Sequence, residues 1–193
     1  MAPPRKHETD VILDAARGLI LTEGPRAASV AAIAKASGAP VGTLYHRFGD
    51  RDGIVAATWL RALDRFQSLA MAATADSALQ TAVAMALSAI DYARAFPGDA
   101  RLLLTIRPED LVDADGGDLA ADIVSRNAPL VERLRELARE LYGVEDRRAL
   151  DALQRAVVDL PYAAVRRHGG DIPDWLAADL ADSVRALVAA YRQ

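Results

Sequence analysis

Apolar residues recur along nearly the whole chain with the 3.6-residue period of amphipathic helices. Alternating runs of β-branched and aromatic residues, which are typical of strands, are almost absent, whereas Ala, Leu, Arg and Asp dominate. The pattern therefore predicts a nearly all-helical protein. After residue 50, the expected helices are 51–73, 77–96, 99–106, a helix from about 119 that Pro129 bends, 145–168 and 173–191.

Two short helical patterns meet at a tight corner within residues 29–48, SVAAIAKASGAPVGTLYHRF. Ser29 can cap the first pattern, and Gly38 lies where the chain must turn sharply and a positive φ costs glycine little. Pro40 fits the first turn of the second pattern, in which Leu44 shares an apolar face with the aromatic residue four positions later. This is the layout of a DNA-reading helix-turn-helix.

With the preceding helix TDVILDAARGLILTEG and the following GDRDGI, the segment resembles the N-terminal domain of TetR/AcrR-type transcriptional regulators over roughly residues 9–55. The matching residues are Ile12, Leu13, Ala15, Ala16, Gly24, Ser29, Gly42, Thr43, Leu44, Tyr45 and Phe48. The chain departs from the usual pattern at Ile20, Pro25 and Arg51, of which Arg51 keeps the charge of the usual Lys. The resemblance implies a regulator that binds a palindromic operator in double-stranded DNA.

Eight residues are the candidates for contact with DNA: Ser29, Lys35, Val41, Gly42, Thr43, Tyr45, His46 and Arg51. Residues 41–43 open the recognition helix and are candidates for base-edge or thymine-methyl contact. Tyr45 is expected to donate to phosphate, and Arg51, at a helix start, to clamp a phosphate together with backbone N–H groups. The alternatives are a half-buried aromatic for Tyr45 and ordinary surface charges for His46 and Arg51.

The chain is expected to form two domains, a DNA-binding domain over 1–53 and a ligand-binding and dimerisation bundle over 54–193. Residues 1–8 are expected to form a flexible basic arm. The first domain has seven basic and six acidic residues, a net charge of +1, and the remainder has sixteen and twenty-one, a net charge of −5. The overall charge of −4 therefore does not argue against DNA binding by the N-terminal face.

The helix over 77–96 is apolar on two sides, so we expect it to run through the centre of the second domain. A cavity beside it for a small apolar or amphipathic effector would be lined by Phe66, Met85, Tyr92, Phe96, Tyr142 and Tyr162, with Arg107 and Asp159 as polar anchors. An ordinary core is the alternative interpretation of these residues. Pro161, inside a helical pattern, indicates a local irregularity that either a cavity or simple curvature explains.

The last two helices, separated by Gly169-Gly170-Asp171, are expected to form an antiparallel pair. The family resemblance implies that this pair packs against its symmetry mate, so that the protein is a homodimer. The interface candidates are Leu153, Val157, Leu160, Trp175, Leu180, Val184 and Leu187. In the alternative, both apolar stripes face only the core of their own chain.

Other chemistry has little support. The chain has no cysteine, its three histidines are scattered, and the acidic loop 113–118 lacks the bidentate acid that a calcium loop needs, because that position is Val124. Motifs of the GxGxxG, GKS/T and GxSxG types are missing, so we expect no metal, no cofactor and no enzymatic activity. The rival hypotheses are an all-helical enzyme or carrier, and a constitutive nucleoid-type or interaction protein without an effector.

Neither a signal peptide nor an apolar run of the ~20 residues needed to span a bilayer occurs in the sequence. A soluble, cytoplasmic protein that does not enter a membrane is therefore expected.

Overall fold

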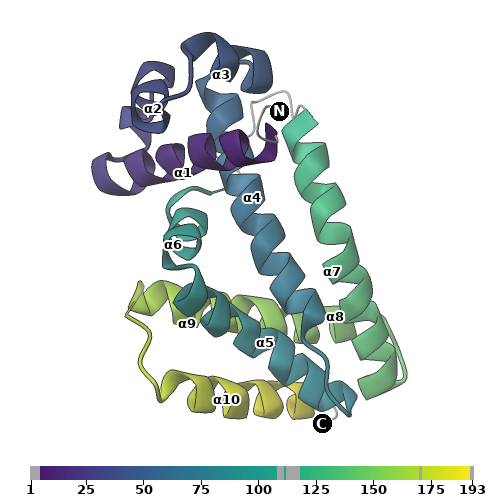
Figure 1. Ribbon diagram of the computed structural model, residues 1–193. Coiled ribbons are helices and arrows are strands. Elements are labelled where there is room, and N and C mark those ends of the chain that lie inside the picture. Colours follow the sequence, from purple (N-terminus) through teal and green to yellow (C-terminus); the bar gives the residue numbers. More distant parts are fainter. Residues whose placement is uncertain (1–4, 108–110, 112–117, 170, 192–193) are drawn as a thin grey trace. The chain divides into compact units, whose positions relative to one another are not determined.

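A computed structural model describes residues 5–107, 111, 118–169 and 171–191, and within these ranges it contains helices and no strand, which confirms the predicted fold class (Figure 1). The acidic loop 113–118 lies outside the described residues except for its last residue. The elements are α1 (Arg5–Glu23), the 3₁₀ turn η1 (Pro25–Ala27), α2 (Val30–Ser37), α3 (Val41–Phe48), α4 (Arg51–Ala72), α5 (Ala78–Ala95), α6 (Pro97–Thr105), α7 (Asp118–Tyr142), α8 (Arg147–Gln154), a π-helical segment (Arg155–Asp159), α9 (Leu160–His168) and α10 (Leu176–Ala190).

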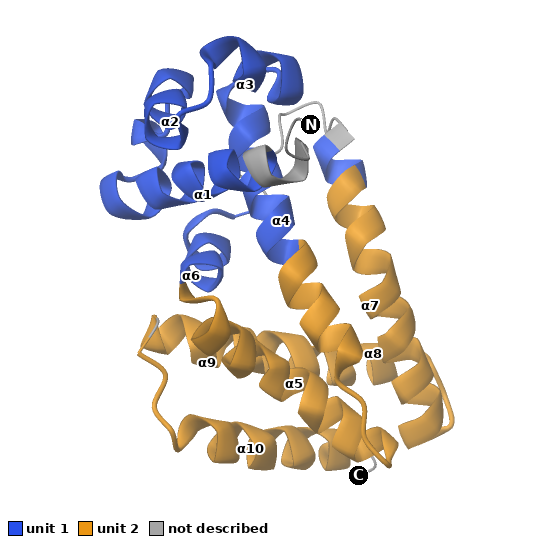
Figure 2. Ribbon diagram, in the orientation of Figure 1, with its two compact units in different colours: residues 1–63, 98–121 blue, residues 64–97, 122–193 orange. Residues whose placement is uncertain are grey.

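The chain forms two compact units, which Figure 2 shows in two colours. One unit comprises Met1–Leu63 and Gly98–Ala121, and the other comprises Asp64–Pro97 and Asp122–Gln193. The divisions fall inside α4 and α7, so each of these helices contributes residues to both units. The first unit contains α1, α2 and α3 together with the start of α4 and nearly all of α6.

Several helix ends follow from local chemistry. The Ser77 hydroxyl accepts a hydrogen bond from the backbone N–H of Gln80 at 3.3 Å, which is the cap expected for α5. Asp146 caps α8 in the same way. The helix expected to begin at residue 99 begins two residues earlier, because Pro97 occupies a first-turn position that needs no N–H donor. Residues 5–8, expected to be a flexible arm, belong to α1.

The helix predicted over 145–168 is not uniform, because a π-helical segment separates α8 from α9. Pro161 has no N–H and cannot donate to the carbonyl of Val157, four residues earlier. The wider turn over Arg155–Asp159 lies immediately before that gap in the hydrogen-bond ladder. The irregularity expected at Pro161 is therefore present, and it takes the form of a π turn.

Apolar side chains from five helices form the core of the first unit. The largest fully buried ones are Ile12 and Ile20 from α1, Ile33 from α2, Leu44 from α3, Ile54 from α4 and Leu102 from α6. Burying side chains of this size stabilises a fold by about 1.5–3 kcal/mol each. Ile20, which replaces the Phe common at its position, fills that core without remaining exposed.

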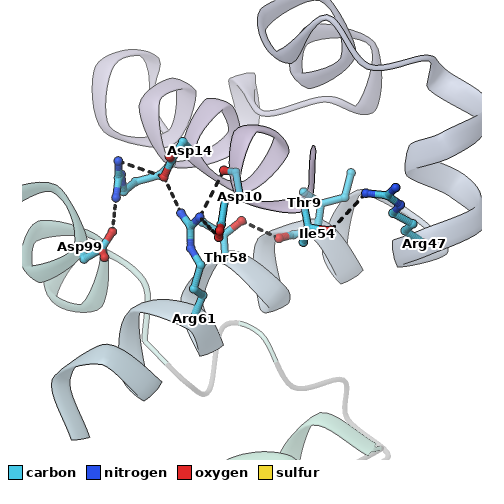
Figure 3. Close-up of polar contacts among 9 residues, drawn as sticks. Thr9, Asp10, Asp14, Arg47, Ile54, Thr58, Arg61 and Asp99 are labelled. Atoms are coloured by element: carbon cyan, nitrogen blue, oxygen red, sulfur yellow. Dashed lines mark hydrogen bonds and ion pairs between the residues drawn. The ribbon is translucent and has the colours of Figure 1, made fainter. Parts of the chain in front are cut away.

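A chain of alternating charges joins α1 to α4 and α6 in the first unit (Figure 3). Arg61 of α4 pairs with Asp10 at 3.0 Å and with Asp14 at 2.6 Å. Asp14 also pairs with Arg17 at 3.2 Å, and Arg17 forms a hydrogen-bonded ion pair with Asp99 of α6. Only 1% of the Asp99 side chain is exposed, so its charge depends on Arg17 for compensation.

Two further features hold α6 in this place. A Cβ on residue 98 would lie 3.2 Å from Nε of Arg17, so Gly98 leaves room for the arginine to approach Asp99. The Trp59 indole of α4 donates to the carbonyl of Ile106 at 3.1 Å, which ties α4 to the end of α6.

In the second unit α5 packs against α9, α10 and the π-helical segment, as its two-sided apolar pattern predicted. It buries Val83, Met85, Ile90 and Tyr92 among other residues. Two side-chain contacts join α7 to α4. Arg126 donates to the Asp64 carboxylate at 2.6 Å, and Gln67 donates to the amide oxygen of Asn127 at 2.6 Å. No helix in the described parts of the chain is both long and apolar enough to cross a bilayer.

The buried Asp99 carboxylate gives the first prediction. We expect Asp99→Asn to lower the free energy of unfolding by about 1–3 kcal/mol, because it leaves the Arg17 guanidinium without its buried counter-charge. Asp52→Asn is the matched control, since the Asp52 side chain is 79% exposed beside Arg51 and its loss costs about 0.5 kcal/mol or less. Urea unfolding followed by circular dichroism measures both, and equal midpoints would contradict a structural role for the buried pair.

Candidate nucleic-acid interface

The corner between α2 and α3 has the geometry that the sequence predicted. The Ser29 hydroxyl accepts the N–H of Ala32 at 3.2 Å and so caps α2. Gly38 ends α2 in the left-handed conformation, with a φ of 72° that a residue bearing a side chain adopts only with strain. Pro40 then directly precedes α3. The two helices are therefore joined by a turn with little freedom.

Packing of α3 against the unit separates its two faces. Leu44 is fully buried and Phe48 is half-buried, so they attach the helix to the core. On the opposite face Val41 is 45% exposed and Tyr45 is 53% exposed, and Gly42 and His46 are exposed as well. Four of the predicted recognition residues thus share an outward face, and Thr43 is half-buried at its side.

A surface hollow lies beside this face and includes a residue of α1. It is lined by Thr9, Gly42, Thr43, His46 and Arg47. The Arg47 guanidinium donates to the Thr9 hydroxyl at 3.1 Å (Figure 3). Neither Thr9 nor Arg47 is among the residues that the sequence predicts to contact DNA. Arg47 directly follows the predicted contact residues Tyr45 and His46, and this position could have indicated it as a further contact. No sequence pattern indicated that Thr9 lies beside α3.

Arg51 differs from its expected arrangement. Its guanidinium donates to the backbone carbonyl of Pro25 and pairs with Asp52, so it is not aimed freely at a phosphate. Asp50 accepts the N–H of Gly53 at 2.8 Å and thereby occupies one of the N–H groups expected to bind phosphate. A Cβ at residue 53 would lie 1.9 Å from the carbonyl oxygen of Phe48, so only glycine fits this close approach.

The remaining two candidates for DNA contact lie on α2 or directly before it. Lys35 is exposed. Ser29 is exposed too, but its hydroxyl oxygen already accepts the capping bond, which leaves the hydroxyl proton for another partner.

The residues predicted to bind an effector do not gather at one place. Phe66, Tyr92 and Phe96 form an aromatic cluster in the second unit, with 5.5 Å between the ring centres of each adjacent pair, and Met85 is buried. Tyr142 lies elsewhere, its ring 4.1 Å from that of Tyr191 and its hydroxyl donating to the carbonyl of Val188.

The other effector candidates are exposed. Tyr162 is 44% exposed, Asp159 is exposed, and Arg107 belongs to the first unit. Six residues from α8, the following π segment, α10 and the residue after α10 line a small surface hollow: Arg148, Ala152, Arg155, Leu187, Ala190 and Tyr191. None of them was a candidate for effector binding.

The seven interface candidates fall into two groups. Leu153, Val157, Leu180 and Val184 are buried in the core of their own unit, so the expectation that they meet a partner is not supported, and the alternative of inward-facing stripes describes these four. Trp175 is 56% exposed, Leu187 is 36% exposed and Leu160 is half-buried, so these three are available to a partner. The apolar period alone did not separate the two groups, because the stripe on each helix is wide.

Comparison with known proteins agrees with this geometry. Residues 12–58 match the family described as "Bacterial regulatory proteins, tetR family". A comparison of the sequence with curated proteins found no match. Among solved structures, a TetR family transcription regulator from Marinobacter aquaeolei VT8 is similar with a TM-score of 0.74, at 17% identity over 94% of this chain and 95% of that one.

Two further solved structures have the same fold. The fatty acid degradation regulator FadR from Bacillus halodurans has a TM-score of 0.67 at 20% identity, covering 97% of this chain and 96% of that one. The TetR family regulator PfmR from Thermus thermophilus has a TM-score of 0.66 at 20% identity, covering 92% and 96%. The family and these neighbours are transcription regulators and not enzymes.

Two glycines of the corner give the second prediction. We expect Gly38→Ala to lower the free energy of unfolding by about 1 kcal/mol or more, because its φ of 72° is unfavourable for alanine. Gly42→Ala is the matched control, because Gly42 is helical with open space around it, and alanine there should raise stability by up to about 1 kcal/mol. Thermal unfolding of both variants checks the opposite signs.

Proposed function

We propose that the chain, of which residues 12–58 match the tetR family of bacterial regulatory proteins, is a homodimeric repressor that binds a palindromic operator through α3 and leaves it when a small apolar or amphipathic effector binds the second unit. The observation that carries the proposal is the outward face of α3, which presents a valine, a tyrosine and a histidine on a helix attached to the core by Leu44. In this proposal the protein acts on DNA in the cytoplasm.

In DNA recognition, the two ends of α3 have different tasks. Val41, Gly42 and Thr43 at its start contact base edges in the major groove, where a methyl, a hydroxyl and an approachable backbone discriminate between base pairs. Tyr45 and His46 donate to phosphates, and the Arg47 side chain, oriented by Thr9, adds a cation beside them. These backbone contacts set the orientation of the helix, and the base contacts set its specificity.

Arg51 has a smaller part in this arrangement than the sequence alone indicated. Its bond to the Pro25 carbonyl holds the start of α4 against the turn that precedes α2. The charge still adds to the positive field of the interface, and a direct phosphate contact would require the guanidinium to leave that carbonyl.

Two copies are needed because a palindrome presents two half-sites. Recognition helices of a dimer enter successive major grooves when they are about 34–36 Å apart, or a suitable multiple. The exposed residues Tyr162, Trp175 and Leu187 on the last two helices are apolar surface of the kind that a partner covers.

The effector proposal rests on the aromatic cluster Phe66, Tyr92 and Phe96, which is partly open at Phe96. Arg65 lies over the Phe96 ring, with 5.9 Å between Cζ and the ring centre, and supplies a cation at the edge of the cluster. One structural neighbour is a fatty acid degradation regulator, which favours an acyl chain as the apolar part of the effector. The effector releases DNA only if it binds the released state more tightly.

Selection of binding sites from a random duplex pool tests the DNA proposal directly. We expect an enriched palindrome, and a slope of log K against log salt that becomes shallower by about 1 in Tyr45→Phe/Arg47→Ala, because one phosphate-facing cation is lost. Arg101→Ala is the control, an exposed arginine of α6 in the same unit, and should leave the slope unchanged. A pool without enrichment, or an unchanged slope and affinity in the double variant, would reject the interface.

Light scattering tests the dimer. We expect the wild-type chain to have about twice the 20.6 kDa mass of one chain. Trp175→Asp/Leu187→Glu should give well-folded monomers, because both side chains are exposed in the single chain and the new charges would be buried in the dimer. Val124→Glu, which changes a 70% exposed valine of α7, should remain dimeric. A dimeric double variant would place the interface elsewhere.

A further inference from the structure

The sequence of α3 limits how this helix can read base pairs. The strongest contacts to base edges in the major groove come from Arg or Lys to guanine, from Asn or Gln to adenine, and from Asp or Glu to cytosine. The sequence of α3 is VGTLYHRF, and Arg47 is its one residue of these types. Strong hydrogen-bonded readout by α3 would therefore depend on this arginine.

Arg47 is bound to another helix. Its guanidinium donates to the Thr9 hydroxyl of α1 at 3.1 Å, and its side chain is half-buried (Figure 3). It also lies in the last turn of α3, whereas a recognition helix contacts base edges through its N-terminal residues. Arg47 is therefore placed for the DNA backbone and not for a base.

The first residue of α3 is both apolar and exposed. Val41 is 45% exposed, and its side chain can neither donate nor accept a hydrogen bond. The apolar group that a base pair presents in the major groove is the C5 methyl group of thymine. Any other base would offer Val41 only polar atoms, which would lose water without gaining a hydrogen bond. The chemistry of Val41 thus favours thymine.

Nothing in the described parts of the chain explains the glycine at position 42. Gly42 is helical and exposed, and a Cβ at this position would project into open space. Alanine is the more stable residue in a helix, so the glycine weakens α3. Glycine does, however, allow a backbone to approach a ligand closely. Because Gly42 directly follows Val41 and lines the surface hollow beside α3, the room it leaves is suited to DNA at the start of the helix.

We propose that Val41 reads the C5 methyl group of a thymine in each operator half-site, and that Gly42 leaves room for the start of α3 to come close enough for this contact. This inference rests on the proposed function, and it adds the base that α3 selects and the chemical group by which it does so. Burying one methyl group changes affinity about fourfold, and a palindrome repeats the contact. A 5-methylcytosine carries the same methyl group and is therefore accepted better than cytosine.

Deoxyuridine tests the methyl contact, because it pairs like thymine and lacks only the C5 methyl group. The duplex is the palindrome selected from the random pool, and each thymine of the half-site is replaced in turn together with its symmetry mate. We expect at least one such replacement to weaken binding by the wild-type protein about fifteenfold, which is about fourfold for each half-site. Fluorescence anisotropy of labelled duplexes at fixed salt measures the dissociation constants.

Val41→Ala identifies the side chain that makes the contact. We expect this variant to bind the selected operator more weakly than wild type and to lose less than about twofold on the same deoxyuridine replacement, because most of the apolar contact is already gone. Val124→Ala is the matched control, an exposed valine of the second unit, and should keep the full loss. With the wild-type protein, 5-methylcytosine in place of that thymine should bind about fourfold more tightly than cytosine for each half-site.

Gly42→Ala tests the close approach in a variant that is expected to be more stable than wild type. We expect operator affinity to fall by at least about tenfold, because the added methyl group overpacks the contact with DNA. The midpoint of thermal unfolding should rise at the same time, so that lost binding does not reflect lost folding. Gly18→Ala is the matched control, because Gly18 is an exposed helical glycine of α1 with open space at its Cβ, and it should leave operator affinity unchanged.

The outcomes separate this inference from the proposed function. A random pool without an enriched palindrome would overturn both. If deoxyuridine costs the wild type and Val41→Ala equally, the methyl contact is overturned and DNA binding stands. If Gly42→Ala binds the operator as tightly as wild type, the close approach at Gly42 is overturned, and DNA binding again stands.

Discussion

The position of α3 depends on apolar contacts with the neighbouring helices. An eight-residue helix is not stable alone in water, and Leu44 is the one side chain of α3 that is fully buried. Its direction is therefore determined by the core beneath it, to which α1, α2 and α4 contribute isoleucines, and by the Gly38 turn. Because Leu44 and Phe48 pack against the core, the opposite face of α3 is exposed to solvent.

That core is tied to α6 by charge as well as by apolar contact. Asp99 is almost completely buried, and it reaches α4 through Arg17, Asp14 and Arg61. A buried ion pair contributes less to net stability than to holding one arrangement, because its partners cannot separate without leaving a charge in an apolar environment. The pair therefore joins α6 to α1, the helix that carries Thr9, which accepts the hydrogen bond from Arg47.

Features whose determining interactions are local could be predicted from the sequence. The caps at Ser29 and Ser77 and the left-handed Gly38 follow from neighbours within a few residues, and each is present in the structure. The apolar stripes of the last helices could not be interpreted in this way, because the same spacing fits residues buried in their own chain and residues that meet a partner. The sequence predicted that Leu153, Val184 and Trp175 lie at the dimer interface. Leu153 and Val184 are buried in their own chain, whereas Trp175 is exposed. Arg51 was expected to bind a phosphate, but its guanidinium donates to the backbone carbonyl of Pro25, 26 residues earlier.

The sequence by itself determined the helical class, the corner at Gly38 and the position of the helix-turn-helix segment, because helix period, caps and turns act over short distances along the chain. Only the tertiary structure decided which apolar residues stay inside their own chain, that Thr9 lies beside the recognition helix, and that Asp99 is buried against Arg17. These features depend on contacts between segments 38 or more residues apart, whose meeting is set by the packing of whole helices and not by any local pattern.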